Sequence, residues 1–193
     1  MKSIKLGAKT IDEKSLYFIA DIGANHNGSL EKAKKLIKLA KDSGADAAKF
    51  QNFKASKIVS AKGFKNLKIS HQSKWKKSVY EIYEDASIPT EWTKKLKEEC
   101  DKVEIDYFTS PYDFESVDLV DPFVELYKIG SGDISWIEII EHILKKGKPT
   151  LIASGASTIQ DVERVMNLTK KYNNDIVLMQ CNTNYSGTAD NFN

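Results

Sequence analysis

Arginine is almost absent from this 193-residue chain. Of its 29 basic residues, only Arg164 is an arginine. Because arginine binds carboxylates and phosphates through a rigid fork of donors, an anion site built from this chain depends mainly on lysine, hydroxyl groups and backbone N–H groups. The lysines are dispersed among 27 acidic residues and the net charge is +2, without a basic block interleaved with aromatics. Nucleic-acid binding is therefore not indicated.

Cysteine and long apolar runs are also scarce. Cys100 and Cys181 are too few and too far apart to indicate a disulfide framework or a zinc site. The opening residues, MKSIKLGAKTIDEK, have no apolar core like that of a signal peptide. No later run approaches the ~20 apolar residues of a membrane span. We therefore expect a cytoplasmic protein with no membrane partner, and the length favours a single domain.

Short apolar segments alternate with helical patterns along the chain. Strands are expected at 17–20, 45–53, 107–110, 126–131, 150–155 and 176–181. Helices are expected at 30–40, 90–103, 114–120, 135–144 and 158–166. This alternation is typical of right-handed parallel β-α units. The polar, lysine-rich stretch 54–87 is expected to be an irregular loop that serves as a lid or a binding loop.

Helix boundaries are marked by capping residues. Ser29 is expected to cap the first helix and Asp113 the third. Ser135 and Glu138 match a capping box, and Thr158 is expected to open the helix that follows the fifth strand. His26, in the turn after the first strand, is expected to be a structural hydrogen-bonding residue.

Polar side chains end all six predicted strands. They are Asp21, Lys49 with Gln51, Thr109 with Ser110, Lys128 with Ser131, Ser154, and Gln180 with Asn182. In a parallel barrel all these ends lie on one rim, whereas an open doubly wound sheet binds ligands mainly at one switch point. No GxGxxG follows the first strand. We therefore predict an α/β fold of the (β/α)8 TIM-barrel type.

The strand ends combine two lysines with at least four hydroxyl groups. This is the chemistry expected around a small, multiply anionic ligand such as a phosphorylated carboxylic acid. Asp21 is the carboxylate among them, suited to orient a hydroxyl group or a metal-bound group. The pattern predicts anion binding without naming a reaction.

Several ordered motifs resemble the sialic acid synthase (N-acetylneuraminate synthase) family. The family's opening motif, I-A-E-I-G-x-N-H-N-G, stands here as IADIGANHNG, and GADAAKFQNFKA matches the next conserved stretch. FTSPYD, YKIGSGDI and PTLIASGAS match later blocks in order and spacing. The resemblance covers residues 16–185. It implies a (β/α)8 barrel that condenses phosphoenolpyruvate with N-acetylmannosamine or a related N-acylated aldose, giving a nine-carbon 2-keto sugar acid and phosphate.

The resemblance also implies roles for single residues. Asp21, Lys49 and Lys128 are the implied catalytic residues. Asp21 replaces the family's glutamate near the aldehyde and a divalent metal, Mn²⁺ or Mg²⁺. Gln51 and Tyr185 would contact the sugar, and Asn182 is a further substrate contact. The implied phosphoenolpyruvate contacts are Lys49, Ser110, Lys128, Ser131 and Ser154.

Measured against the family, the sequence stops after the sixth strand. The family's two metal-binding histidines and its C-terminal antifreeze-like domain lie beyond that point, and a complete barrel usually needs ~250 residues. Residues 1–193 are therefore expected to form one incomplete barrel domain, the N-terminal part of an enzyme that is a homodimer at full length.

Two other interpretations stay open at this point. The chain could be a non-catalytic barrel fragment or short protein that binds a phosphorylated ligand or pairs with a partner chain. It could also be another phosphoenolpyruvate-using or aldolase-type barrel, because the chemistry of the strand ends does not exclude one.

Overall fold

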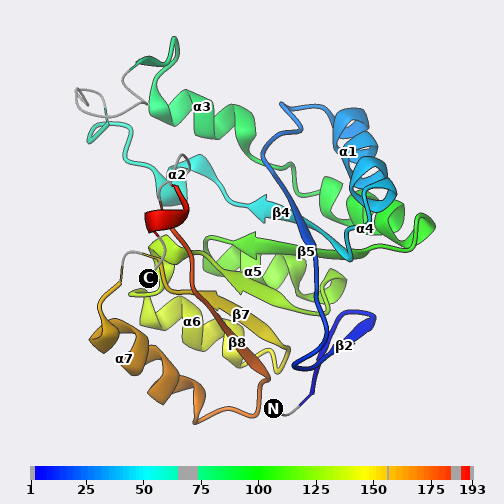
Figure 1. Ribbon diagram of the computed structural model, residues 1–193. Coiled ribbons are helices and arrows are strands. Elements are labelled where there is room, and N and C mark those ends of the chain that lie inside the picture. The colour runs from blue at the N-terminus through cyan, green and yellow to red at the C-terminus, as the bar shows by residue number, and fades with distance from the viewer. Residues whose placement is uncertain (1–2, 65–73, 156, 184–187, 192–193) are drawn as a thin grey trace. The chain divides into compact units, whose positions relative to one another are not determined.

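The computed structural model describes residues 3–64, 74–155, 157–183 and 188–191. The chain forms two compact units. One is Tyr17–Phe123, and the other combines Val124–Asn193 with Met1–Leu16. Each unit contains parallel strands connected by helices, as the predicted β-α alternation requires (Figure 1).

The unit Tyr17–Phe123 contains three parallel strands in the order β3-β4-β5. The strands are β3 (Ile19–Gly23), β4 (Ala47–Asn52) and β5 (Asp106–Pro111). Its helices are α1 (Leu30–Asp42), α2 (Ala55–Ile58), α3 (Val79–Ala86), α4 (Trp92–Lys102), α5 (Phe114–Val120) and the 3-10 turn η2 (Asp121–Phe123). The helices α1 and α4 lie side by side, α1 against β4 and α4 against β5 (Figure 1).

Local chemistry explains where these elements begin. The Ser29 side chain accepts the Lys32 N–H and so caps α1, which buries Ala33, Ile37 and Ala40 at helical spacing. The Asp113 carboxylate likewise caps α5 by accepting the Ser116 N–H. Both caps were expected from the sequence and both are confirmed.

The other unit contains three parallel strands in the order β6-β7-β8 and a separate antiparallel hairpin. The strands are β6 (Tyr127–Ile129), β7 (Thr150–Ala153) and β8 (Ile176–Met179), and the hairpin pairs β1 (Ile4–Leu6) with β2 (Lys9–Ile11). Its helices are α6 (Ile137–Leu144) and α7 (Ile159–Thr169), with the 3-10 turns η3 (Ser131–Asp133) and η4 (Ala189–Asn191). Thr158 caps α7 through a complete capping box with Asp161.

The buried segments supply the core of each unit. Five of the six residues of β4 are buried, as expected of a parallel strand covered on both faces. In the other unit, α6 buries its apolar stripe Ile139, Ile140, Ile143 and Leu144. No helix in the described part of the chain is long and apolar enough to cross a membrane.

Two sequence predictions need correction, and one element was missed. The stretch 54–87 is not wholly irregular, because it contains α2 and α3, the latter opened by a capping box between Ser78 and Glu81. The predicted box at Ser135 is wrong: α6 begins after Trp136 without a side-chain cap, because residues 131–133 form a 3-10 turn that shifts the helix start. The β1–β2 hairpin was not predicted.

Candidate functional site

The unit Tyr17–Phe123 carries four predicted site residues on its parallel strands. Asp21 lies on β3, Lys49 and Gln51 on β4, and Ser110 on β5. In the strand register Asp21 is opposite Lys49, and Gln51 is opposite Ser110. Asp21 is close to Lys49 and to Gln51 within this unit, and the roles predicted for these residues stay predictions.

Asp21 and Lys49 form an ion pair of unequal burial. The Lys49 Nζ lies 2.8 Å from the Asp21 Oδ1, and the lysine side chain is 4% exposed whereas the aspartate side chain is 61% exposed. A buried ammonium group needs an anionic partner, and Asp21 supplies it.

Gly23 lets the Asp21 and Gln51 side chains come close to the backbone. Its φ of +51° is in the left-handed region that favours glycine. A Cβ at this position would lie 3.4 Å from the Asp21 Oδ1 and 3.6 Å from the Gln51 Oε1. The Gln51 amide also donates a hydrogen bond to the Tyr112 hydroxyl at 3.4 Å.

The Ser110 hydroxyl is buried and has no hydrogen-bond partner among the described residues. Such orphaned hydroxyls are uncommon and point to a bound water or ligand. The neighbouring ends of β4 and β5 are fixed by a buried network. In it, Thr109 donates to the Asn52 Oδ1 at 2.7 Å and Asn52 donates to the Thr93 hydroxyl at 3.3 Å. Ser110 therefore follows a residue whose side chain is held by buried hydrogen bonds.

The turn that follows β3 is held by His26. The His26 ring is fully buried, its Nδ1 accepts the Gly28 N–H at 3.1 Å, and it meets the Trp92 ring edge-on at 5.6 Å between centroids. Burial lowers the pKa of His26, with the nearby Lys32 charge acting in the same direction. The predicted structural role of His26 is confirmed.

The second unit holds the other predicted residues, among them Lys128 on β6, Ser131 in η3 and Ser154 after β7. The Ser154 N–H and hydroxyl both donate to the Met179 carbonyl, at 2.9 and 3.1 Å. Gly155, with φ +55°, packs so tightly that a Cβ there would lie 2.3 Å from the Ser131 Cβ. Ser131 and the β7–α7 turn are therefore in direct contact.

Asp133 is a carboxylate of this unit that the sequence reasoning missed. It ends η3, two residues after Ser131. Its pKa is raised, because burial has a larger effect than the positive charge of Lys128, which lowers it. Its position in the matched YKIGSGDI block was the signal that could have found it. Asn182 follows β8, and Tyr185 lies outside the described residues.

A hydroxyl-rich hollow of about 290 Å³ adjoins Ser131. It is lined among others by Ser131, Gly132, Ser135, Ser157, Asp161 and Thr183. The Asp161 carboxylate already accepts the Thr158 N–H and hydroxyl, so it places negative charge at the start of α7. This charge disfavours phosphate at that helix end and suits hydroxyl groups of a ligand.

The predicted metal role of Asp21 requires further ligands. Among the described residues, no three His, Cys, Asp or Glu side chains are grouped so that they could hold a metal ion. Asp21 is instead paired with Lys49. The described residues do not by themselves form a divalent metal site, and additional donors would have to come from outside them.

Known proteins are similar in sequence to most of this chain. Residues 36–193 match the NeuB family. The N,N'-diacetyllegionaminic acid synthase of Campylobacter jejuni (serotype O:2) is 34% identical over 179 residues, which are 89% of this chain and 53% of that protein. The pseudaminic acid synthase of the same strain is 32% identical over 183 residues, covering 94% of this chain and 53% of that protein.

A solved structure supports the fold assignment. The N-acetylneuraminic acid (sialic acid) synthetase of Leptospira borgpetersenii serovar Hardjo-bovis, in complex with citrate, superposes with a TM-score of 0.86 at 25% identity. The superposition covers 100% of this chain and 63% of that one. The predicted α/β fold of the TIM-barrel type is confirmed, and the chain spans about half the length of the curated relatives it matches.

Proposed function

Because the chain belongs to the NeuB family, we propose that its protein condenses phosphoenolpyruvate with an N-acylated aldose to give a nine-carbon 2-keto sugar acid and phosphate. The observation that carries this proposal is the buried Lys49 ammonium group on β4, which is paired with the exposed Asp21 carboxylate on β3. The buried ammonium group is suited to bind the anionic substrate. The exposed carboxylate beside it is suited to an uncharged carbonyl compound.

The proposed reaction forms one carbon–carbon bond. The third carbon of phosphoenolpyruvate attacks the aldehyde carbon of the sugar, and water adds its oxygen to the second carbon. The bond between that carbon and the phosphate ester oxygen then breaks, and inorganic phosphate leaves. Carbon–oxygen cleavage leaves the ester oxygen in the phosphate.

Residue roles follow from charge and burial. We assign Lys49 to an anionic group of phosphoenolpyruvate, and to the same ligand the Ser110 hydroxyl, which has no hydrogen-bond partner in the described part of the chain. Gln51, half-buried beside Asp21, is assigned to the sugar. In the other unit Lys128, Ser131 and Ser154 keep their predicted contacts to phosphoenolpyruvate, and Asn182 and Tyr185 keep theirs to substrate.

A divalent metal, Mn²⁺ or Mg²⁺, would polarise the aldehyde when bound. Asp21 is the residue of this chain proposed to approach it, together with ligands from outside the described residues. The homodimer and the cytoplasmic location likewise remain proposals.

Phosphate release tests the proposal. The protein expressed from its own gene is mixed with phosphoenolpyruvate, N-acetylmannosamine and Mn²⁺, and inorganic phosphate is measured against a reaction that lacks the aldose. We expect phosphate release that depends on the aldose. The absence of release with N-acetylmannosamine and with other N-acylated aldoses would contradict the proposal. Trapping of Lys49 by borohydride would instead indicate a Schiff-base aldolase.

A further inference from the structure

We propose that the hollow between α3 and the turn after β3 binds the neutral body of the aldose, and that Asp85 on α3 determines sugar selectivity there. This inference rests on the proposed function and assigns a second region to the sugar, beyond the strand ends. The hollow measures about 530 Å³, within the usual range of small-molecule sites. Its lining includes Ala24, Asn25, Asn27, Ile82, Asp85 and Ala86.

One lining residue of the hollow, Ala24, is next in sequence to the glycine beside the Asp21 and Gln51 side chains. Ala24 directly follows Gly23, and the oxygens of Asp21 and Gln51 lie within 4 Å of the position of a Cβ on Gly23. A sugar whose aldehyde lies near Asp21 could therefore extend its other carbons along the turn toward α3.

The chemistry of the lining suits a neutral sugar better than an anion. No lysine or arginine is among the described residues that line the hollow, whereas the Asp85 carboxylate is. The lining offers no cation to an incoming phosphate or carboxylate, and the Lys77 ammonium group is already paired with Asp85. The Asn25 and Asn27 amides offer donors and acceptors to hydroxyl groups, and the apolar side chains offer a surface to an acyl methyl group.

The wall formed by the turn is preorganised. Asn27 and Gly28 both have left-handed backbone conformations, with φ of 50° and 71°. The Gly28 N–H is fixed by the buried His26 ring, and the Asn25 amide donates to the Ile22 carbonyl at 3.0 Å. A wall held in this way loses little conformational entropy when a ligand binds.

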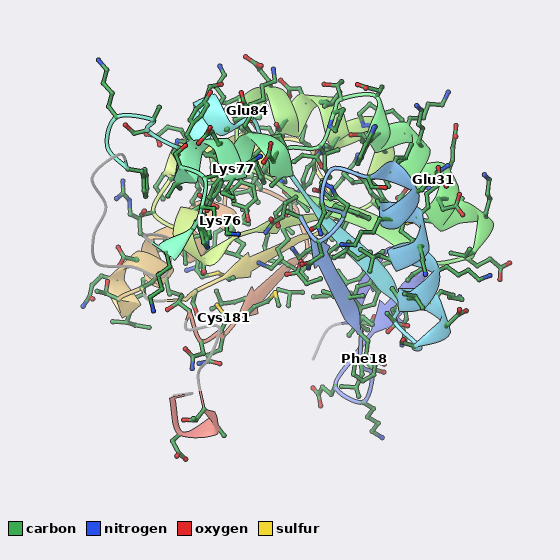
Figure 2. The ribbon with its side chains drawn as sticks, turned by 90° about the horizontal axis from the view of Figure 1, so that it is seen from above. Phe18, Glu31, Lys76, Lys77, Glu84 and Cys181 are labelled. Atoms are coloured by element: carbon green, nitrogen blue, oxygen red, sulfur yellow. The ribbon has the colours of Figure 1, made fainter. Side chains whose placement is uncertain are left out.

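The wall formed by α3 is fixed at both ends. The capping box between Ser78 and Glu81 sets the start of the helix. Near its other end Asp85 accepts a hydrogen bond from the Lys77 ammonium group through Oδ2. Figure 2 labels Lys77, just before the helix, and Glu84, which is on it. The ion pair orients the Asp85 carboxylate, whose other oxygen is left to accept from a sugar hydroxyl.

Substitution of Asp85 by asparagine tests the assignment. In Asp85→Asn the side chain keeps its shape but loses its charge, and we expect KM for N-acetylmannosamine to rise roughly tenfold, the usual effect of losing a charge-assisted hydrogen bond. KM for phosphoenolpyruvate and kcat should stay within about twofold, because this side chain contacts neither the anionic substrate nor the reacting atoms. Binding of N-acetylmannosamine is also measured without turnover, by ligand-observed NMR.

Two matched variants separate the possible causes. Lys77→Gln breaks the ion pair but keeps the carboxylate, and Glu84→Gln removes an adjacent exposed carboxylate that does not line the hollow. Glu84→Gln should keep the KM for the aldose within about twofold of the parent, whereas Lys77→Gln, which removes the cation that orients Asp85, should raise it by less than Asp85→Asn does. If Glu84→Gln raised KM for the aldose as much as Asp85→Asn does, the inference would be overturned. The effect would then come from the net charge of α3 and not from Asp85 itself.

Filling the hollow provides a second, independent test. Ala86→Leu adds volume at its α3 wall, and we expect weaker aldose binding with unchanged phosphoenolpyruvate binding and unchanged circular dichroism. If the parent protein releases aldose-dependent phosphate but neither Asp85→Asn nor Ala86→Leu changes KM for the aldose, the inference fails and the proposed function stands. If the parent neither binds nor consumes any N-acylated aldose, the proposed function fails.

Discussion

At the scale of single residues, the proposed binding of phosphoenolpyruvate depends most on Lys49. Its side chain is almost fully buried, and its ammonium group reaches the Asp21 carboxylate. Lys49→Met keeps much of the apolar stem but removes the charge. We expect kcat/KM for phosphoenolpyruvate to fall by at least about 100-fold, because the lost cation is the proposed partner of the anionic substrate in a desolvated site. Steady-state phosphate release measures this change.

The matched control for Lys49 is Lys76→Met. Lys76 is exposed and precedes α3 (Figure 2), so its loss should leave kcat/KM within about twofold. Equal activity in the two variants would contradict the assignment of Lys49. Thermal unfolding of both variants shows whether loss of activity reflects loss of the fold.

His26 provides a second test at this scale. Asparagine and leucine have similar shapes, and both lack the imidazole ring that meets Trp92, but the Asn Oδ1 can replace the Nδ1 that accepts the Gly28 N–H. We expect His26→Leu to be less stable than His26→Asn by about 1–3 kcal/mol in urea unfolding, because it leaves a backbone donor unpaired. Equal stability would show that this hydrogen bond does not hold the turn.

The same residue predicts a pH dependence. Burial holds the pKa of His26 below its ordinary value of 6.5, so the unfolded chain binds a proton first as the pH falls. The contribution of His26 to the free energy of unfolding is therefore complete above pH 6.5. It decreases as the pH falls from 6.5 toward the lower pKa of the folded state. The difference in unfolding free energy between the parent and His26→Asn should shrink over this range. A difference that stays constant from pH 7.5 to pH 5 would contradict this assignment.

At the scale of elements, Gly155 packs closely where the chain leaves β7. Gly155 has φ +55°, and a Cβ there would lie 2.3 Å from the Ser131 Cβ and 2.8 Å from the Thr183 Cγ2. We expect Gly155→Ala to lower the free energy of unfolding by about 2–5 kcal/mol, since left-handed strain adds to overpacking. Urea titration measures this change.

Gly147 separates strain from packing. It also has a positive φ, +74°, but no atom of the described residues beyond its chain neighbours lies within 4 Å of the position its Cβ would take. Gly147→Ala should therefore lower the free energy of unfolding by about 1–2 kcal/mol, from left-handed backbone strain alone. If the two alanine variants lost equal stability, the contact between Ser131 and the turn would not contribute.

At the scale of the whole molecule, most of the repeating strands and helices were predictable. Parallel strands covered by helices carry continuous apolar runs, so β4 and β7 were readable from sequence. Their carboxyl ends must lie at one edge of each sheet, which is why Asp21, Lys49 and Ser110 were expected to gather. The Asp21–Lys49 ion pair depends on the register between β3 and β4, which the sequence does not specify.

The missed features lie where local signals are weak or compete. The strands of the β1–β2 hairpin have three residues each, and α2 has four, too few to show a period. The helix α3 lies in a polar, lysine-rich stretch that masks its Ser78 capping box. Ser135 matches a capping motif, but the preceding 3-10 turn displaces the start of the helix. In these cases the tertiary contacts, and not the local sequence pattern, determine which element forms.

The proposed reaction is tested most directly by the fate of the oxygen that bridges carbon and phosphorus in phosphoenolpyruvate. Phosphoenolpyruvate labelled with ¹⁸O at that position is incubated with the protein, N-acetylmannosamine and Mn²⁺, and the released phosphate is examined by ³¹P NMR. The account predicts that the label appears in the phosphate, together with one nine-carbon keto acid for each phosphate released. Unlabelled phosphate, or release that does not depend on the aldose, would contradict it.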